Sequence, residues 1–595
     1  MLLLLLLQSF SPLSGAPLPK RLVIALDAIA YQDMKALQEG VDYEDSQGRV
    51  VHRQGFHEGY FPVSRLVSTF PSFSDGAWTE MVGNRPLPGY QRSYYSLAAN
   101  REIVLNPLTS TMDYEKQITW REPSRVRFAM SYVHPMKEFQ REVDGMVKDF
   151  LHTPCPEDNY YAMILSPDSG QHMAADIFAM LCILDERLRD LRAIYRTREG
   201  RELEILIMSD HGNNHAGRGR RIKIKKLLRG AGYRIGTFIV HPKDVVLPTA
   251  GIQSWVTVHN APAQTERLME LLSHLEGVDV LTGRPPGRED HFLVMNSQGQ
   301  RATIEWDEGR NLYRYAAITG DPIQYLPACE ALRRKGCLDA KGFAPADAWM
   351  AETLAHRYPV ALERIARSHT RAVLNPATIL ISLANDYVHA GWLVMAATRL
   401  VKSGGTHGGL DDLNSTGILL SSYAPTQDTT TTRIAGLYGG FSGLRDSRVN
   451  EQGAEWVSAA GQAMIAVNRG PLDWAHHRLP SEQVFLHIWT PHFGPATLNS
   501  PIEVFLKQIR PICSPKARPW NEAPCEVAGQ RFLLETPVAF PDSTRHERVY
   551  ALPPDLSLEP QKEYSVRARF QTGGKAVRLF RFTFFTDDRG LPAAY

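Results

Sequence analysis

Several features that would identify a protein class at once are scarce in this sequence. Its 595 residues include only six cysteines, and no two of them have the Cys-x-x-Cys spacing of a structural zinc site. The 66 basic and 64 acidic side chains leave a formal charge of +2, so charge gives no argument for a nucleic-acid polymer as a partner. Fixed-period repeats and long low-complexity tracts are also absent, which argues against a repeat architecture.

A run of leucines opens the chain but is too short to cross a membrane. Residues 2–7 are all leucine, whereas a spanning helix needs roughly 20 apolar residues. The run and the small residues Ser14 and Ala16 match the apolar middle and the cleavage region of a secretory signal. We therefore expect residues 1–19 to be a signal segment, the protein to be periplasmic or secreted, and no transmembrane span. A frayed apolar N-terminus or a misassigned start codon is the alternative.

The spacing of the cysteines agrees with an oxidising compartment. Cys329 and Cys337 are close in sequence, as are Cys513 and Cys525, and both pairs have loop-like surroundings. Such pairs are typical of local disulfides in exported proteins. Cys182 lies in an apolar helical pattern, where we expect it to fill the core.

The first half of the chain alternates short apolar runs with helical patterns. Residues 21–26, 160–165 and 203–208 are apolar and of strand length, and helical spacing is found over 136–151 and again up to about Arg196. This order predicts an α/β fold with a mostly parallel central sheet flanked by helices. A chain of this length is expected to form two or three domains.

Three further regions are predicted around this core. Residues 233–370 are expected to form an inserted cap subdomain, with a hairpin between 291–295 and 301–306. The basic stretch 218–229 is expected to be a solvated helix face rather than a phosphate site, and 379–400 a helix followed by a strand. The catalytic domain would cover 20–480, and the alternating residues near 564–570 and 577–585 predict a β-sandwich-like domain over 481–595.

Polar side chains capable of binding a metal follow three of the predicted strands. Asp27, Asp168 and Asp210 each come just after one, and the carboxyl ends of parallel strands are where α/β sheets bind ligands. His172 is four residues after Asp168, and His211 follows Asp210 directly. Carboxylate oxygens with imidazole nitrogens suit Zn²⁺ or a similar divalent ion. Taken singly, each of these residues is more readily explained as a turn cap or a helix-face pair.

A further histidine lies in a glycine-rich segment. His407 is flanked by Gly404, Gly405, Gly408 and Gly409, which let the backbone approach closely and direct the imidazole. The rival histidines lack this context; they are His215, His259 and His389.

In this order the motifs resemble those of the alkaline phosphatase superfamily, most closely its nucleotide pyrophosphatase/phosphodiesterase branch. The motifs are Asp27 after the first strand, Thr69-Phe70-Pro71, Asp168-x-x-x-His172, Asp210-His211-Gly212 and Thr406-His407-Gly408-Gly409. The resemblance runs from about residue 20 to 430, apart from the 233–370 insertion. The chain has Ser72-Phe73 where the branch has Asn-His after Thr-Phe-Pro, so the resemblance says little about the substrate.

The resemblance implies two divalent metal ions, expected to be Zn²⁺. Asp168, His172 and His407 would bind one ion; Asp27, Asp210, His211 and the Thr69 hydroxyl would bind the other. Thr69 would be the catalytic nucleophile, with Ser68, Ser72 and Ser74 as nearby alternatives. Asn84 is a candidate contact to a substrate oxygen.

The implied activity is hydrolysis of a small-molecule phosphate ester, with a phosphodiester as the expected substrate. Two ions about 3.5–4 Å apart can stabilise both the attacking and the leaving oxygen of an in-line displacement. The nucleophile would carry the phosphoryl group as a phospho-enzyme intermediate. A phosphomonoesterase or phosphonate hydrolase with the same metals is the first alternative, and a cell-surface binding protein with a relic catalytic core is the second. The sequence makes no prediction of oligomeric state.

Overall fold

The structure is a computed structural model. It describes residues 18–44, 48–82, 86–104, 112, 114–122, 127, 130–152, 159–215, 219–249, 251–390 and 404–434. From 435 on it describes the backbone of the strands that lie between Gly453 and Phe585 and the side chains of Leu506 and Tyr564. Nearly all of the predicted signal segment lies outside the described residues, and so do Asn84, Cys155, Cys513 and Cys525.

The chain divides into two compact units, and the first is built on parallel strands. This unit comprises residues 1–66, 119–209 and 417–428. Strand β1 (Arg21–Leu26) pairs in parallel with both β8 (Asn159–Ile164) and β9 (Glu204–Ser209), and β7 (Trp120–Arg121) pairs in parallel with β8. The order of the whole sheet is β23 (Thr429–Thr430), β4 (Ser64–Val67), β22 (Thr416–Ser421), β9, β1, β8 and β7. The three strands predicted from apolar runs are thus confirmed, to within one residue at each end.

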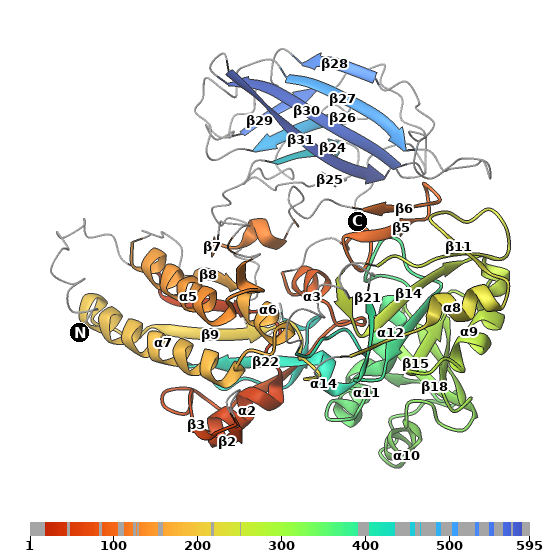
Figure 1. Cartoon of the computed structure of the whole chain (residues 1–595), viewed down its shortest axis with the longest axis horizontal. Coiled ribbons are helices and arrows are strands. Elements are labelled where there is room, and N and C mark those ends of the chain that lie inside the picture. The colour runs from red at the N-terminus through yellow and green to blue at the C-terminus, as the bar shows by residue number, and fades with distance from the viewer. Residues whose placement is uncertain are drawn as a thin grey trace. The chain divides into compact units, whose positions relative to one another are not determined.

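Three helices cover one face of these strands. They are α2 (Tyr31–Glu39), α5 (Pro135–His152) and α7 (Ile177–Glu199) (Figure 1). Alternate residues of β1, namely Leu22, Ile24 and Leu26, are in the same buried cluster as side chains from all three helices. Side chains alternate between the two faces of a strand, so this alternation assigns one face of β1 to the helices. The predicted helices over 136–151 and up to about 196 correspond to α5 and α7.

The second unit contains a nine-stranded sheet. The unit comprises residues 67–118, 210–416 and 429–595. The strand order is β11 (Arg234–Gly236), β12 (Asp244–Val246), β14 (Trp255–Asn260), β20 (Ile379–Leu383), β15 (Val278–Gly283), β16 (His291–Asn296), β17 (Arg301–Asp307), β18 (Leu312–Thr319) and β19 (Ala344–Pro345). Only β11 and β12 pair in parallel among these neighbours. The predicted hairpin is the pair β16–β17.

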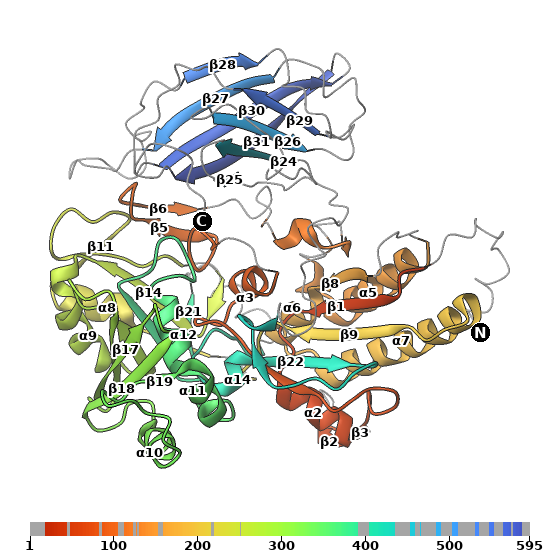
Figure 2. The same ribbon diagram turned by 180° about the vertical axis from the view of Figure 1, so that it is seen from behind.

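Helices lie on both faces of this sheet (Figure 2). Helices α8 (Ile224–Gly230) and α9 (Thr265–Ser273) pack in one cluster with Leu293 and Met295 of β16. Phe292 points to the opposite face, where its ring stacks on His369 just after α12 (Ala361–Ser368). The remaining helices of this region are α10 (Leu326–Arg334) and α11 (Ala346–Thr353).

One prediction about this region is wrong, and another holds only in part. Residues 379–383 form β20, between β14 and β15, and β21 (Tyr387–Ala390) follows, instead of a helix followed by a strand. A short apolar run buried on both faces has no periodicity that separates strand from helix. The sheet therefore extends beyond residue 370, the predicted end of the insertion. In the basic stretch, the helix begins only at Ile224, and Arg220 and Arg221 form the short exposed strand β10.

The strands after residue 435 form two antiparallel sheets of four. One has the order β25 (Met464–Ile465), β24 (Gly453–Ser458), β26 (Val484–Trp489), β29 (Glu547–Ala551), and the other β28 (Gln530–Leu534), β27 (Ile502–Ile509), β30 (Glu563–Thr572), β31 (Lys575–Phe585). The β-rich prediction is confirmed at this level. Because β24 pairs with β26, the β-rich region begins before the predicted boundary at 481.

The predicted disulfide between Cys329 and Cys337 is wrong. Both are free thiols, as is Cys182. The rest of α10 follows Cys329, and its rise of about 1.5 Å per residue carries the chain beyond the roughly 4 Å that separates the Cβ atoms of a disulfide. Among the described residues, no helix is long and apolar enough to cross a membrane.

Candidate metal centre

Three neighbouring parallel strands end at the same level. Leu26 of β1 is the register partner of Ile164 in β8 and of Ser209 in β9. The loop after β1 is fixed on both sides, since Asp27 N donates to Ile164 O (3.0 Å) and Ile29 N donates to Ser209 Oγ (2.7 Å). The polar residues that follow the three strands therefore start from one edge of the sheet, as the sequence predicted.

Asp27, Asp210 and His211 form the first of two groups that could hold a metal ion. Their ligand atoms lie within 4.8 Å of one another, and all three side chains are buried. Nδ1 of His211 lies 2.9 Å from Gly212 O. Because a carbonyl oxygen only accepts, Nδ1 carries the proton and Nε2 presents a lone pair, as a metal ligand requires. Glycine is needed at 212, since a Cβ there would lie 2.2 Å from Leu413 O.

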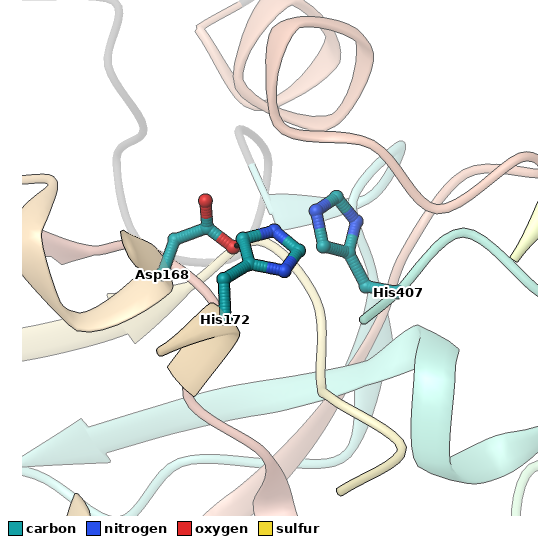
Figure 3. A group of neighbouring side chains, drawn as sticks. All are labelled: Asp168, His172 and His407. Carbon is teal, nitrogen blue, oxygen red and sulfur yellow. Dashed lines mark ion pairs between the residues drawn. The ribbon is translucent and has the colours of Figure 1, made fainter. Parts of the chain in front are cut away.

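Asp168, His172 and His407 form the second group, and their ligand atoms also lie within 4.8 Å of one another. Asp168 and His172 are one turn apart on helix α6 (Ser166–His172), with 3.4 Å between Oδ1 and Nε2. Figure 3 shows the His407 imidazole on the far side of His172 from Asp168. Each side chain of this group is half-buried, so this end of the centre is the more accessible to solvent.

The segment 404–410, here called the His407 loop, directs its histidine by close backbone packing. Nδ1 of His407 lies 2.9 Å from Ser72 O, which leaves Nε2 as the ligand atom. Gly408 has φ 111°, and a Cβ there would lie 1.9 Å from Cδ1 of Trp255. The ring of His407 stacks on that of His211, with 3.9 Å between centroids and 15° between planes. The two groups of ligands are therefore adjacent through these two rings.

The loop after β9 is tied to the His407 loop by a reciprocal pair of hydrogen bonds. Thr406 N donates to Asn214 Oδ1, and Asn214 N donates to Thr406 O, both at 3.0 Å. Gly405 allows this approach, because a Cβ there would lie 1.9 Å from Asn213 Oδ1. His211 and His407 are thus positioned by backbone contacts as well as by their own hydrogen bonds.

Helix α6 is positioned by a buried acid from α5. Glu142 accepts hydrogen bonds from Leu165 N and Ser166 N, each at 3.0 Å, and from the Ser166 hydroxyl. These groups are at the first turn of the helix that carries Asp168 and His172. Burial raises the pKa of Glu142 to about 7, against the opposing effect of these three hydrogen bonds.

The predicted nucleophile, Thr69, and its neighbour Ser74 have different environments. The hydroxyl of Thr69 donates to Pro71 O at 2.7 Å, and the residue lines a small pocket with Arg364 and Arg367. Ser74 is the first residue of helix α3 (Ser74–Met81), and its Oγ lies 3.1 Å from Nε2 of His211. The hydroxyl that the structure brings to a potential metal ligand is therefore that of Ser74.

Helix α3 also presents its N-terminal backbone amides. Among the described residues no side chain caps it, and its N-cap residue is Phe73. The first amides of a helix have no partner within the helix, and they favour anions such as a phosphoryl group. Ser74 is thus at a position where a hydroxyl and several N–H groups could contact the same anion.

Each group has a donor set that could bind a divalent metal ion. Each group combines carboxylate oxygen with imidazole nitrogen, a mixture that Zn²⁺ accepts in tetrahedral sites. Each offers three protein ligands, and a zinc site that keeps its fourth position for water or substrate is typical of catalysis. The number and identity of the metals are part of the proposed function.

The rival histidines differ from His407 in their surroundings. His259 and His389 are buried in the second unit, and burial lowers the pKa of each to about 3. His389 is hydrogen-bonded through Nε2 to the Thr249 hydroxyl at 2.8 Å, and His259 packs against the ring of Tyr95. Among the described residues, neither belongs to a group that could hold a metal.

Comparison with known proteins adds no assignment. The chain matches no protein-family model and no curated protein.

Sequence reasoning gave Ser74 only as one of several alternatives and missed Tyr132 altogether. Tyr132 is 37% exposed as a whole, but burial of its phenol and, to a lesser extent, the charges of Asp168 and Asp27 raise the pKa of that group. Neither the Ser74 contact nor this electrostatic effect has a local signal in the sequence, because each depends on the tertiary fold. The only clue to Ser74 was its position at a predicted helix start.

Proposed function

We propose that this protein hydrolyses phosphate esters with the help of two divalent metal ions, Zn²⁺ being the best match to the ligands, and that phosphodiesters are its main substrates. The observation that carries the proposal is the pair of adjacent Asp/His groups, with the Ser74 hydroxyl beside one of them. The likeness to the alkaline phosphatase superfamily is part of the same proposal and rests on the order of the motifs.

The chemistry assigns a role to each part of the site. When bound, the two ions would stabilise the negative charge on the attacking and leaving oxygens. The Ser74 oxygen forms a bond to phosphorus as the bond between phosphorus and the leaving oxygen breaks. The proton of the Ser74 hydroxyl passes to solvent, and the departing alkoxide takes up a proton from solvent. Water then hydrolyses the phosphoserine ester and restores the hydroxyl. The first amides of α3 donate to the phosphoryl oxygens throughout.

Two residues compete for the role of nucleophile. The resemblance favours Thr69, whereas the 3.1 Å contact between Ser74 Oγ and His211 Nε2 supports Ser74. We assign the role to Ser74, because a nucleophile must reach the groups that activate it.

The test compares zinc-loaded and metal-stripped protein on methyl p-nitrophenyl phosphate, a diester, and on p-nitrophenyl phosphate, a monoester. Variants Ser74→Ala and Thr69→Val are matched controls for one another, since each removes one hydroxyl. We expect Ser74→Ala to lower kcat roughly 10³-fold or more with unchanged zinc content, and Thr69→Val to have a small effect. Acid quenching during turnover, followed by peptide mapping, should locate the phosphoryl group on Ser74.

Each outcome has a defined meaning. Activity that survives metal removal would refute the two-metal mechanism. A large loss in Thr69→Val alone, or a phosphoryl group mapped to Thr69, would return the role of nucleophile to that residue. Faster turnover of the monoester would establish the phosphomonoesterase alternative. A zinc-loaded protein inactive on both esters would favour the binding-protein alternative.

A further inference from the structure

One buried arginine connects the turn before Ser74 with the His407 loop. Arg364 is on α12, and its Nη2 donates to Thr69 O (2.9 Å) and to Ser72 Oγ (3.2 Å). Its Nη1 donates to Leu410 O (2.9 Å) and to Pro359 O (3.0 Å). The two ends of one guanidinium therefore hold two segments that are more than three hundred residues apart in the sequence.

The same two segments are also bonded to each other. Ser72 N donates to Gly408 O at 3.3 Å, Ser72 Oγ lies 3.1 Å from Gly409 O, and Ser72 O accepts from His407 Nδ1 at 2.9 Å. The orientation of the His407 imidazole therefore depends on where the carbonyl of Ser72 lies. Arg364 fixes this carbonyl from the other side, because it holds the turn at Thr69 and at the Ser72 hydroxyl.

The environment of Arg364 is unusual for a cation. Its side chain is buried, and none of the described acids forms an ion pair with it. Burial lowers its pKa to about 10, so it is still charged at neutral pH. Burying an unpaired charge is costly, and four bonds to oxygen atoms of the chain offset only part of that cost. The guanidinium of arginine is planar and carries five N–H donors in a fork. It is therefore the side chain that can hold several carbonyl oxygens at fixed angles.

We propose that Arg364 is a positioning residue that fixes the turn Thr69–Ser72 against the His407 loop and thereby sets the geometry of the metal centre and of Ser74. The inference rests on the proposed function for its catalytic meaning, but the contacts themselves are independent of it. Through Arg364, helix α12, which packs on the nine-stranded sheet, is directly connected to the site. Arg367 on the same helix makes a different contact, since it pairs with Glu80 of α3 at 2.7 Å.

The first experiment measures hydrogen exchange by mass spectrometry on metal-free protein. The variants are Arg364→Lys, which keeps the charge but loses the fork, Arg364→Ala, and Arg367→Gln as a control one turn further along the helix. We expect amide exchange in segments 66–74 and 404–412 to accelerate about tenfold or more in both Arg364 variants, with strands β1, β8 and β9 unchanged. Arg367→Gln should leave 404–412 as in the wild type.

Chemical rescue separates positioning from general destabilisation. Arg364 lines a pocket together with Ser68 and Thr430, so a small cation has a route to the space left in Arg364→Ala. Guanidinium at concentrations well below denaturing should restore slow exchange in both segments, and ammonium should not. If Arg364→Ala does not fold, the Arg364→Lys comparison still decides the proposal.

The second experiment measures metal binding and turnover. We expect the weaker of the two zinc affinities to fall about tenfold in Arg364→Lys, the effect usual for residues that orient a metal ligand, and kcat to fall more than KM changes. Wild-type exchange in both segments, equal acceleration in every peptide, or acceleration that guanidinium leaves unchanged would overturn the proposal. Because exchange needs neither metal nor substrate, an inactive wild type would refute the proposed function without deciding the role of Arg364.

Discussion

Glu142 gives the stability of this protein a pH dependence of unusual sign. An acid bonded to the first turn of a helix normally prefers to be ionised, but here burial raises the pKa to about 7 from an ordinary 4.5. Between these values the native state holds more protons than the unfolded state. The free energy of unfolding therefore falls as pH rises through this range. This contribution is fully present below pH 4.5 and is lost as pH passes 7.

The expected change in the free energy of unfolding follows from the difference between the native and the ordinary pKa of Glu142. A tenfold change in proton affinity is worth about 1.4 kcal/mol, so the difference between 4.5 and about 7 corresponds to about 3 kcal/mol of stability. The loss of stability should appear first in α6, because Glu142 accepts hydrogen bonds from the start of that helix. The metal binding proposed for Asp168 and His172 would weaken together with it.

The assay is urea denaturation of metal-free protein at intervals between pH 4.5 and 8.5, for the wild type and for Glu142→Gln. Glutamine has nearly the same shape and cannot ionise, so its altered hydrogen bonds add a constant offset while all other titrating groups cancel in the difference. We expect the difference between the two proteins to change by about 3 kcal/mol across the range, in favour of the variant at high pH. A difference that is flat, or that changes in favour of the wild type at high pH, would refute the reasoning.

Four further predictions concern the His407 loop, a proposed metal ligand and the thiols. Gly408→Ala should destabilise the protein by about 2 kcal/mol or more, because the new Cβ meets Trp255 at a φ that side chains rarely adopt; urea denaturation measures this, and an unchanged midpoint would contradict it. If the protein binds two zinc ions as proposed, Asp210→Asn should abolish one of the two binding events in calorimetry while the circular dichroism spectrum stays unchanged, and two remaining events would argue against the ligand set. Cys329 and Cys337 should both react with a thiol reagent in unfolded protein without prior reduction. In the native protein Cys329 should react slowly at pH 8, since burial raises its pKa to about 11; rapid reaction there would contradict this.

The central sheet could be predicted from sequence because its strands have a strong local signal. The segments that became β1, β8 and β9 are continuous apolar runs of strand length, each followed within a few residues by an aspartate. The rules of parallel sheets then imply that these aspartates start from one edge. The same rule drew attention to the histidines beside two of these aspartates, whereas His407 was singled out by its glycine-rich segment. The division of the six residues into two groups was implied by the family resemblance.

The failures share a different physical cause. Residues 379–383 were misassigned because a run buried on both faces has no period to read. The disulfide prediction was wrong because Cys329 and Cys337 are close in sequence but are separated in space by the rest of helix α10. Arg364 had no local signal, and Ser74 had only its place at a predicted helix start, since a buried arginine and an ordinary serine acquire their roles from what the fold places beside them. Local pattern finds the strands, and tertiary contact defines the site.

The order of the site residues along the chain has a consequence for biosynthesis. The His407 loop is made only after the whole nine-stranded sheet, and β22, which pairs with β9, is made later still. A chain emerging from the ribosome therefore has Asp27, Asp210 and His211 long before it has His407. The first group of ligands can be complete while translation continues, whereas Asp168 and His172 must wait for their third partner. If the protein binds two ions as proposed, the group of Asp27, Asp210 and His211 would therefore be complete in the growing chain before the group that needs His407.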